Sequence, residues 1–210
     1  MLIIPFIAKP ENVMMKVSCG SRPDENSAIT QPSMSERLYH ISEDAEITIF
    51  RPRPSPSHFD SLRGDVVFAI TEQLLHNYLL PRDCPRITYY QSTNTTQRDR
   101  DIFFGHSAVD FIITVESKWF KVIQETILYC YELPTESFEL LDENAGYYIS
   151  YQSVIPLSVR EIVSPIEELL TRNVELRFVP SLWKVADAVA QSSLQFSMIR
   201  MKYAIPRLFE

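Results

Sequence analysis

The apolar residues of this chain fall into short runs separated by prolines and polar turns, and this spacing constrains the fold more than any other feature. Runs such as Val66–Ile70 and Ile87–Tyr90 are typical of buried strands. Segments with helical spacing lie between some of the runs, but strands and helices do not alternate strictly, as they would in a parallel sheet. The sequence therefore predicts an α+β fold with a mainly antiparallel β core and three to four helices.

Local signals give approximate positions for these elements. The clearest helical periodicity runs from Val109 to Ile123, with Glu116 in its apolar face. A serine cap, a proline and a glutamate within 164–167 indicate the start of another helix. Further helices are expected at 72–80 and 181–191, and strands at 37–42, 66–70, 87–90, 127–133, 147–154, 174–179 and 194–203.

Glycine is scarce, since four glycines stand against fourteen prolines. Glycines so far apart cannot form a glycine-rich phosphate loop, which excludes the common nucleotide-binding loop motifs. Hydrophobic residues make up 45% of the chain, a proportion typical of globular domains. The formal net charge of −7 argues against broad nucleic-acid binding, which requires a basic face, although a local basic pocket is compatible with it.

We expect residues 34–210 to form a single domain and residues 1–33 to be a flexible tail. No stretch is long and apolar enough to span a bilayer, and the apolar segment Leu2–Ala8 contains Pro5, so it makes a poor signal peptide. The three cysteines have no metal or redox spacing, which indicates a reducing, cytoplasmic setting. No metal site is predicted either, because no ligand spacing is present.

His40 is the first candidate for a functional residue. It lies on the strand expected at 37–42, where its side chain shares a face with Ser42 and points away from Tyr39 and Ile41. An imidazole beside a hydroxyl can bind a ligand hydroxyl or a phosphate. The alternative is a core histidine bonded to the backbone, and spacing alone favours that alternative.

Further candidates combine charge with an unusual setting. A buried Glu116 would have to be paired with a cation or have a raised pKa. It could then act as a general base or anchor a catalytic arginine. Alternatively, it could form a structural salt bridge to Arg82 or Arg86. These arginines lie in a proline-bracketed turn, where they could grip a carboxylate or phosphate, or hold Asp83 in a local ion pair. Tyr78 precedes the turn and could stack on a ligand, although such tyrosines more often pack in the core.

From residue 37 onward the chain resembles a bacterial family known only as a domain of unknown function. The resemblance covers about four-fifths of the chain and is most specific in the Pro-Arg-Asp-Cys-Pro-Arg run at 81–86. It rests on the segments 38–44, 67–70, 78–86, 104–105, 129–134 and 180–182, and on Glu116 with Trp119. The family implies almost nothing about activity, and residues 1–33 fall outside the match.

The chain also resembles, more weakly, the ADP-ribosyltransferase-like fold in its strands at 39–42, 67–71 and 147–150. That resemblance implies that NAD is the cofactor, that His40 bonds an NAD ribose and that Tyr78 stacks on nicotinamide. It also implies a glutamate that steadies the sugar cation as nicotinamide leaves. The strand at 147–150 offers no glutamate, which leaves Glu116 or Glu143 for that role.

Three hypotheses follow for the function. The first is an enzyme that binds NAD or an ADP-ribose-type nucleotide through His40, Ser42, Tyr78, Arg82 and Arg86, with Glu116 or Glu143 assisting transfer of ADP-ribose. The second is a non-catalytic module that holds a nucleotide, a phosphorylated small molecule or a peptide on the same scaffold. The third is a partner-binding protein without a small-molecule site, in which protein atoms satisfy His40 and Glu116.

Overall fold

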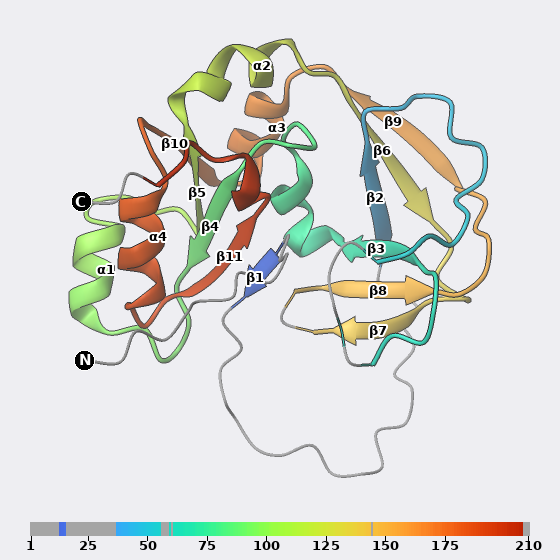
Figure 1. Cartoon of the computed structure of the whole chain (residues 1–210), viewed down its shortest axis with the longest axis horizontal. Coiled ribbons are helices and arrows are strands. Elements are labelled where there is room, and N and C mark those ends of the chain that lie inside the picture. The colour runs from blue at the N-terminus through green and yellow to red at the C-terminus, as the bar shows by residue number, and fades with distance from the viewer. Residues whose placement is uncertain (1–12, 16–36, 56–58, 60, 144, 208–210) are drawn as a thin grey trace.

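The computed structural model describes residues 13–15, 37–55, 59, 61–143 and 145–207. Its strands form two sheets that stand side by side, one of five strands and one of six, with short helices between and around them (Figure 1). Apart from one parallel pair, all neighbouring strands are antiparallel. The predicted α+β class with a mainly antiparallel β core is therefore confirmed.

The six-stranded sheet has β2 near its centre. Its order is β7-β8-β3-β2-β6-β9, and every pairing in it is antiparallel. The strands are β2 (Leu38–Ser42), β3 (Val67–Thr71), β6 (Leu128–Leu133), β7 (Glu139–Asp142), β8 (Tyr147–Ser150) and β9 (Ser158–Ile162).

The five-stranded sheet has the order β1-β11-β4-β5-β10. Its one parallel pair, β5 with β10, is joined by a long connection that passes through the other sheet. The strands are β1 (Val13–Met15), β4 (Arg86–Tyr90), β5 (Phe111–Glu116), β10 (Val174–Val179) and β11 (Gln195–Ile199). Within the segment 1–33, only the β1 residues are described, so the prediction of a flexible tail otherwise lies outside the described residues.

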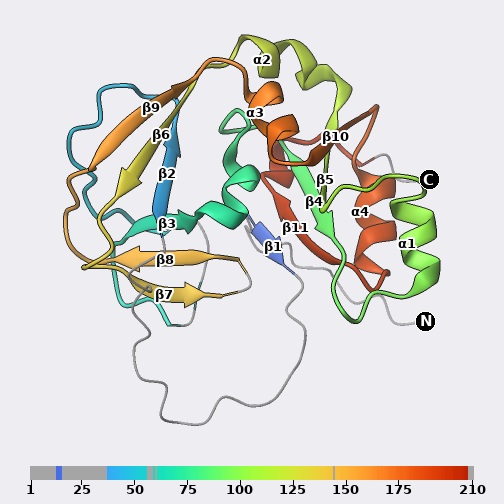
Figure 2. The same ribbon diagram turned by 180° about the vertical axis from the view of Figure 1, so that it is seen from behind.

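The helices are short, and two of them begin with a capping side chain. The Thr96 and Ser164 hydroxyls accept hydrogen bonds from the backbone N–H of Asp99 and Glu167, which satisfies donors that each helix start leaves free. Figure 2 shows α1 and α4 together on one side of the five-stranded sheet. The described helices are α1 (Gln97–Phe103), α2 (Phe120–Glu125), α3 (Pro165–Thr171) and α4 (Trp183–Ala190), with 3-10 helices η1 (Glu72–Tyr78), η2 (Ser117–Trp119) and η3 (Met201–Tyr203).

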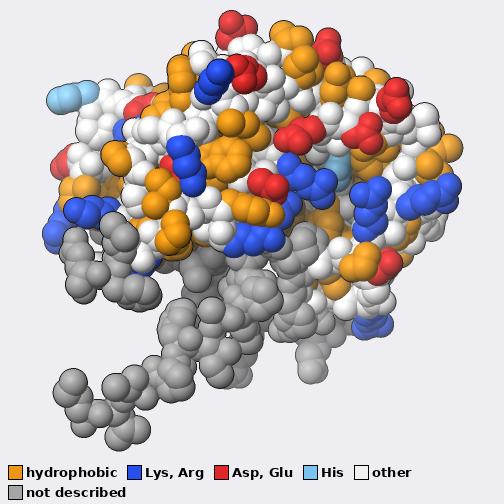
Figure 3. Space-filling model, turned by 45° about the horizontal axis from the view of Figure 1, so that its top comes forward, with side chains coloured by type: hydrophobic (Ala, Val, Ile, Leu, Met, Phe, Trp, Pro, Cys, Tyr) orange, Lys and Arg blue, Asp and Glu red, His pale blue; other side chains and the backbone are white. Residues whose placement is uncertain are grey.

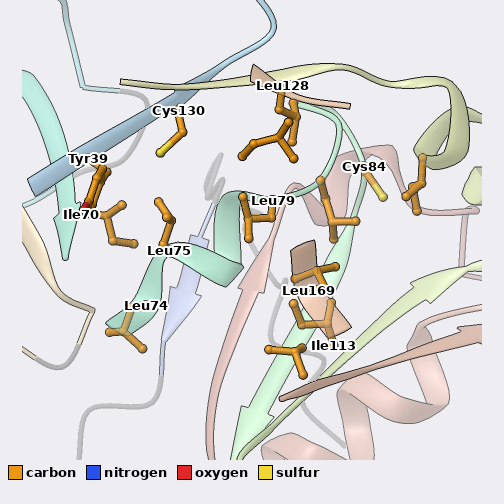
Figure 4. Packing of buried hydrophobic residues seen from close by; sticks show 14 of the residues in the cluster. Tyr39, Ile70, Leu74, Leu75, Leu79, Cys84, Ile113, Leu128, Cys130 and Leu169 are labelled. Carbon is orange, nitrogen blue, oxygen red and sulfur yellow. The ribbon is translucent and has the colours of Figure 1, made fainter. Parts of the chain in front are cut away.

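The largest core lies between the two sheets, where η1 inserts its apolar side chains (Figure 4). Leu75 of η1 and Leu79, which follows its end, are almost fully buried in a cluster that also contains Tyr39 of one sheet and Ile113 of the other. Burying a leucine completely contributes about 2 kcal/mol, so η1 joins the sheets although its own hydrogen bonding is that of a short 3-10 helix. A second core lies beneath α4, and a third covers the opposite face of the six-stranded sheet.

The helix predicted over Val109–Ile123 is wrong. Residues Phe111–Glu116 form the strand β5, which pairs with β4 on one side and β10 on the other, and the helix α2 begins only at Phe120. Both faces of β5 are buried, so its apolar residues form a continuous run, and such a run fits helical and strand spacing equally well. The helix start at Ser164 and Pro165 is confirmed.

Two negative findings concern the described part of the chain. None of its helices is both long and apolar enough to cross a membrane. Within the same residues, no group of three or more histidine, cysteine or acidic side chains is arranged to hold a metal ion.

Candidate ligand-binding site

Strands β2 and β3 separate shortly after they begin to pair. They are in register only at Leu38 with Thr71 and at Tyr39 with Ile70, whereas β2 pairs with β6 along its whole length. Figure 1 shows β2 running almost at right angles to β3. Where the two strands diverge, backbone groups of β3 have no partner on β2. His40 of β2 faces Phe68 of β3 at this place, which we call the β2–β3 fork.

His40 bridges this fork with its imidazole ring. Its Nδ1 lies 2.9 Å from the backbone carbonyl oxygen of Phe68, and its ring packs on Phe50 with 4.7 Å between centroids. A carbonyl oxygen only accepts hydrogen bonds, so Nδ1 carries the proton and Nε2 is left as an acceptor in the neutral ring. No described residue forms a hydrogen bond with Nε2, and the side chain as a whole is half-buried.

The electrostatic setting keeps His40 neutral. Burial lowers the pKa of the imidazole, the Phe68 hydrogen bond opposes that effect, and the guanidiniums of Arg82 and Arg53 lower it further. Both arginines are exposed, and neither forms a salt bridge with a described residue. A neutral acceptor beside two unpaired cations is a setting that suits a ligand with both hydroxyl and anionic groups.

Short backbone contacts hold the two arginines at the fork. The N–H of Arg82 donates to Oε1 of Glu43, 2.8 Å away, which ties the turn after η1 to the end of β2. Arg53 pairs through its own backbone with Val66, at 2.9 and 3.0 Å. The Ser42 hydroxyl accepts from the N–H of Asp44, so its own proton remains available to another acceptor. The sequence-predicted residues His40, Ser42 and Arg82 are thus brought to one end of β2.

Arg86 points away from Arg82, into the protein. It is only 2% exposed, and its guanidinium donates to the carbonyl oxygens of Asn77 (2.8 Å), Cys84 (2.9 Å) and Pro81 (3.3 Å). These bonds close the turn that follows η1 and satisfy carbonyls that a helix end leaves free. The two arginines of this turn therefore do not form a joint grip.

Tyr78 lies beside Arg86 rather than beside His40. The guanidinium of Arg86 stands 5.8 Å from the centre of the Tyr78 ring, and the Tyr78 hydroxyl bonds to that of Tyr147 on β8. Burial is the largest cause of the raised pKa of Tyr78, so its hydroxyl is protonated at neutral pH. The structure thus places Tyr78 and Arg86 in a second cluster, separate in its contacts from the fork.

Glu116 ends β5 in the other sheet and is completely buried. Both of its carboxylate oxygens accept from the backbone N–H of Ile205, at 2.9 and 3.1 Å, and Lys118 Nζ lies 3.2 Å away. The salt bridge expected to Arg82 or Arg86 is instead made with Lys118. The structure does not bring Glu116 to His40, and the alternative Glu143 is exposed beside an open cavity of about 780 Å³.

Several parts of the fork escaped sequence reasoning. Arg53 was not among the predicted site residues, although its place in the proline-rich run at 51–56 was a usable signal. Phe50 and the Phe68 carbonyl left no signal, because their roles depend on how far β2 and β3 remain paired. Figure 3 shows one face of the molecule, where Lys and Arg side chains are interspersed with Asp and Glu side chains and with hydrophobic ones.

Comparison with known proteins identifies a family without an assigned role. The family described as "Family of unknown function (DUF6886)" matches residues 39–204 of the chain. No curated protein and no solved structure matches.

Proposed function

The chain belongs to this family of unknown function, and we propose that its β2–β3 fork binds a nucleotide of the NAD or ADP-ribose type. One observation carries the proposal: His40 is held by Phe68 in the tautomer that leaves Nε2 without a hydrogen-bond partner among the described residues, and it lies in the field of two arginines that form no salt bridge with those residues. Such a site combines an acceptor for a sugar hydroxyl with cations for phosphate groups.

Each group at the fork has a distinct task in this proposal. Nε2 of His40 accepts a hydrogen bond from a ribose hydroxyl, because the neutral ring offers a lone pair there. The Arg82 and Arg53 guanidiniums bind the pyrophosphate oxygens, for which their planar donor geometry is suited. The Ser42 hydroxyl can donate its proton to the same ligand, because the hydroxyl oxygen only accepts a hydrogen bond from the backbone N–H of Asp44.

The order of the strands supports this ligand class. The three segments that resemble the ADP-ribosyltransferase-like fold are the strands β2, β3 and β8, and they are neighbours in the six-stranded sheet. A shared strand order is weaker support than the contacts of His40, because one fold can host unrelated functions.

Binding without turnover fits the fork better than transfer of ADP-ribose. Transfer develops positive charge on the sugar, and a nearby carboxylate is needed to stabilise it. Among the described residues, no carboxylate contributes to the electrostatic setting of His40, and Oε1 of Glu43 accepts from the backbone at Arg82. ADP-ribose transfer, with NAD as the donor, is the second candidate.

Thermal unfolding with ADP-ribose and with NAD tests the binding proposal. A ligand at 100 times its Kd stabilises a protein by about 2.7 kcal/mol, or roughly 5–11 °C for a chain of this size. We expect such a shift in the wild type and in His106→Ala, whose histidine is exposed, and its loss in His40→Ala. An equal shift in His40→Ala would reject the fork as the site. Release of nicotinamide from NAD, measured by chromatography, would establish the second candidate.

A further inference from the structure

Tyr131 of β6 is an almost completely buried tyrosine whose hydroxyl bonds to a loop outside its own sheet. It stands directly opposite His40 of β2, so the two side chains lie on the same face of the sheet. Its hydroxyl donates to the backbone carbonyl oxygen of Asp44 at 2.8 Å and accepts from the backbone N–H of Ile47 at 3.2 Å. One phenol therefore fastens the segment that follows β2 at two points.

The same segment leads to Phe50, whose ring contacts both Tyr131 and His40. The Phe50 ring centroid lies 5.2 Å from that of Tyr131 with the planes at 81°, and 4.7 Å from that of His40. The edge-to-face contact with Tyr131 is a favourable geometry for two aromatic rings. The backbone N–H and carbonyl of Phe50 each bond to Val154 at 2.8 Å. The ring that packs on His40 is thus held by its own backbone and by Tyr131.

His40 needs this support because its own hydrogen bonding fixes the ring only weakly. Among the described residues, its one hydrogen bond joins Nδ1 to the carbonyl oxygen of Phe68. The torsion that turns a histidine ring has broad preferences, and turning it would break this bond. A neutral imidazole without such a bond exchanges between its two tautomers. Phe50 packs on the ring and opposes the rotation, so it preserves the tautomer that leaves Nε2 as the acceptor.

We infer that Tyr131 is a positioning residue of the β2–β3 fork. By fastening the segment between Asp44 and Ile47, its hydroxyl keeps Phe50 against His40 and so keeps Nε2 available to a ligand. Tyr131 acts through these residues and not on the ligand, because its side chain is buried and its hydroxyl both donates and accepts within the protein. This role deepens the proposed function and rests on it for the ligand, whereas its effect on the His40 tautomer does not depend on any ligand.

Long-range ¹⁵N–¹H spectra of the histidine side chains at pH 7, without ligand, test this role. Tyr131→Phe keeps the ring and removes only the hydroxyl that holds the loop. We expect its His40 to show a mixture of the two neutral tautomers, whereas the wild type shows a proton at Nδ1 alone. The matched control is Tyr151→Phe, which also removes a phenol bonded to a loop N–H, that of Arg63, and should leave the His40 spectrum unchanged.

Calorimetric titration with ADP-ribose connects the tautomer to binding. Only the ring protonated at Nδ1 offers Nε2 as an acceptor, so the Kd should rise as the fraction of that tautomer falls, by about fivefold if roughly one fifth remains. Tyr151→Phe should bind as the wild type does. Phe50→Leu removes the ring beside His40, should give the same tautomer mixture, and serves if Tyr131→Phe does not fold.

A His40 ring that stays protonated at Nδ1 alone in Tyr131→Phe and Phe50→Leu would overturn the positioning role. The same mixture of tautomers in Tyr151→Phe would also overturn it, because the effect would then not be specific to the Tyr131 hydroxyl. If ADP-ribose does not bind to the wild type, the proposed function fails, and the spectra recorded without ligand still decide whether Tyr131 positions His40.

Discussion

Replacing Glu116 with alanine should destabilise the protein without affecting the fork. The buried carboxylate accepts twice from the Ile205 N–H, and the Ile205 carbonyl is itself bonded to the Trp183 indole at 2.6 Å. Hydrogen bonds to charged groups contribute about 1.5–3 kcal/mol, and an N–H left without a partner costs a similar amount unless water reaches it. We therefore expect a loss of about 3 kcal/mol, which corresponds to roughly 6–12 °C in Tm for a chain of this length.

Chemical denaturation followed by circular dichroism measures this loss, and ligand titration of the folded variant measures the fork. The matched control is Glu125→Ala, which removes an exposed carboxylate paired with Lys121 at 3.7 Å and should change the stability by less than about 0.5 kcal/mol. A Glu116→Ala protein of normal stability that had lost ADP-ribose binding would refute this reasoning, and would return Glu116 to the ligand site.

Three further predictions concern the core and the turns. Burial lowers the pKa of His76 to about 4, so below pH 6.5 this histidine binds protons more readily in the unfolded chain than in the folded one. The free energy of unfolding should therefore fall by up to about 3 kcal/mol between pH 6.5 and 4. Denaturation curves of His76→Gln should show a weaker dependence of that free energy on pH. Gly146→Ala should cost at least about 2 kcal/mol, because φ is +62° and a Cβ would lie 2.6 Å from the Thr71 hydroxyl. Gly105→Ala, with φ +54° and only an ordinary contact at 3.9 Å to the Asp101 carbonyl oxygen, should cost about 1 kcal/mol, and equal losses would contradict the steric argument. Burial raises the pKa of the Cys84 thiol to about 12, so alkylation at pH 8 followed by peptide mass spectrometry should label it only in denaturant.

The fold class could be predicted because most strands are short apolar runs between strong turn signals. The edge strand β9 escaped prediction, since four of its five residues are exposed and it has no apolar face of its own toward the core. The strand β5 failed for the opposite reason. Burial on both faces removed the alternation that distinguishes a strand from a helix, so tertiary context alone decided its structure.

The candidate site was predictable only in part. Resemblance directed attention to His40, and the strand alternation correctly placed it beside Ser42 on one face of β2. Their place in the same proline-bracketed turn suggested that Arg82 and Arg86 act together, but the Arg82 side chain is exposed and the Arg86 side chain closes the turn. Which way each side chain points depends on the carbonyl groups that η1 leaves free, and a linear sequence does not record these.

The most direct test of nucleotide binding at the fork is a long-range ¹⁵N–¹H spectrum of the histidine side chains, recorded at pH 7 with and without ADP-ribose. The contacts of His40 predict a neutral ring protonated at Nδ1, with an Nε2 resonance that moves on addition of ADP-ribose while that of the exposed His106 does not. A His40 ring protonated at Nε2, or an Nε2 resonance that saturating ADP-ribose leaves unchanged, would contradict the proposal.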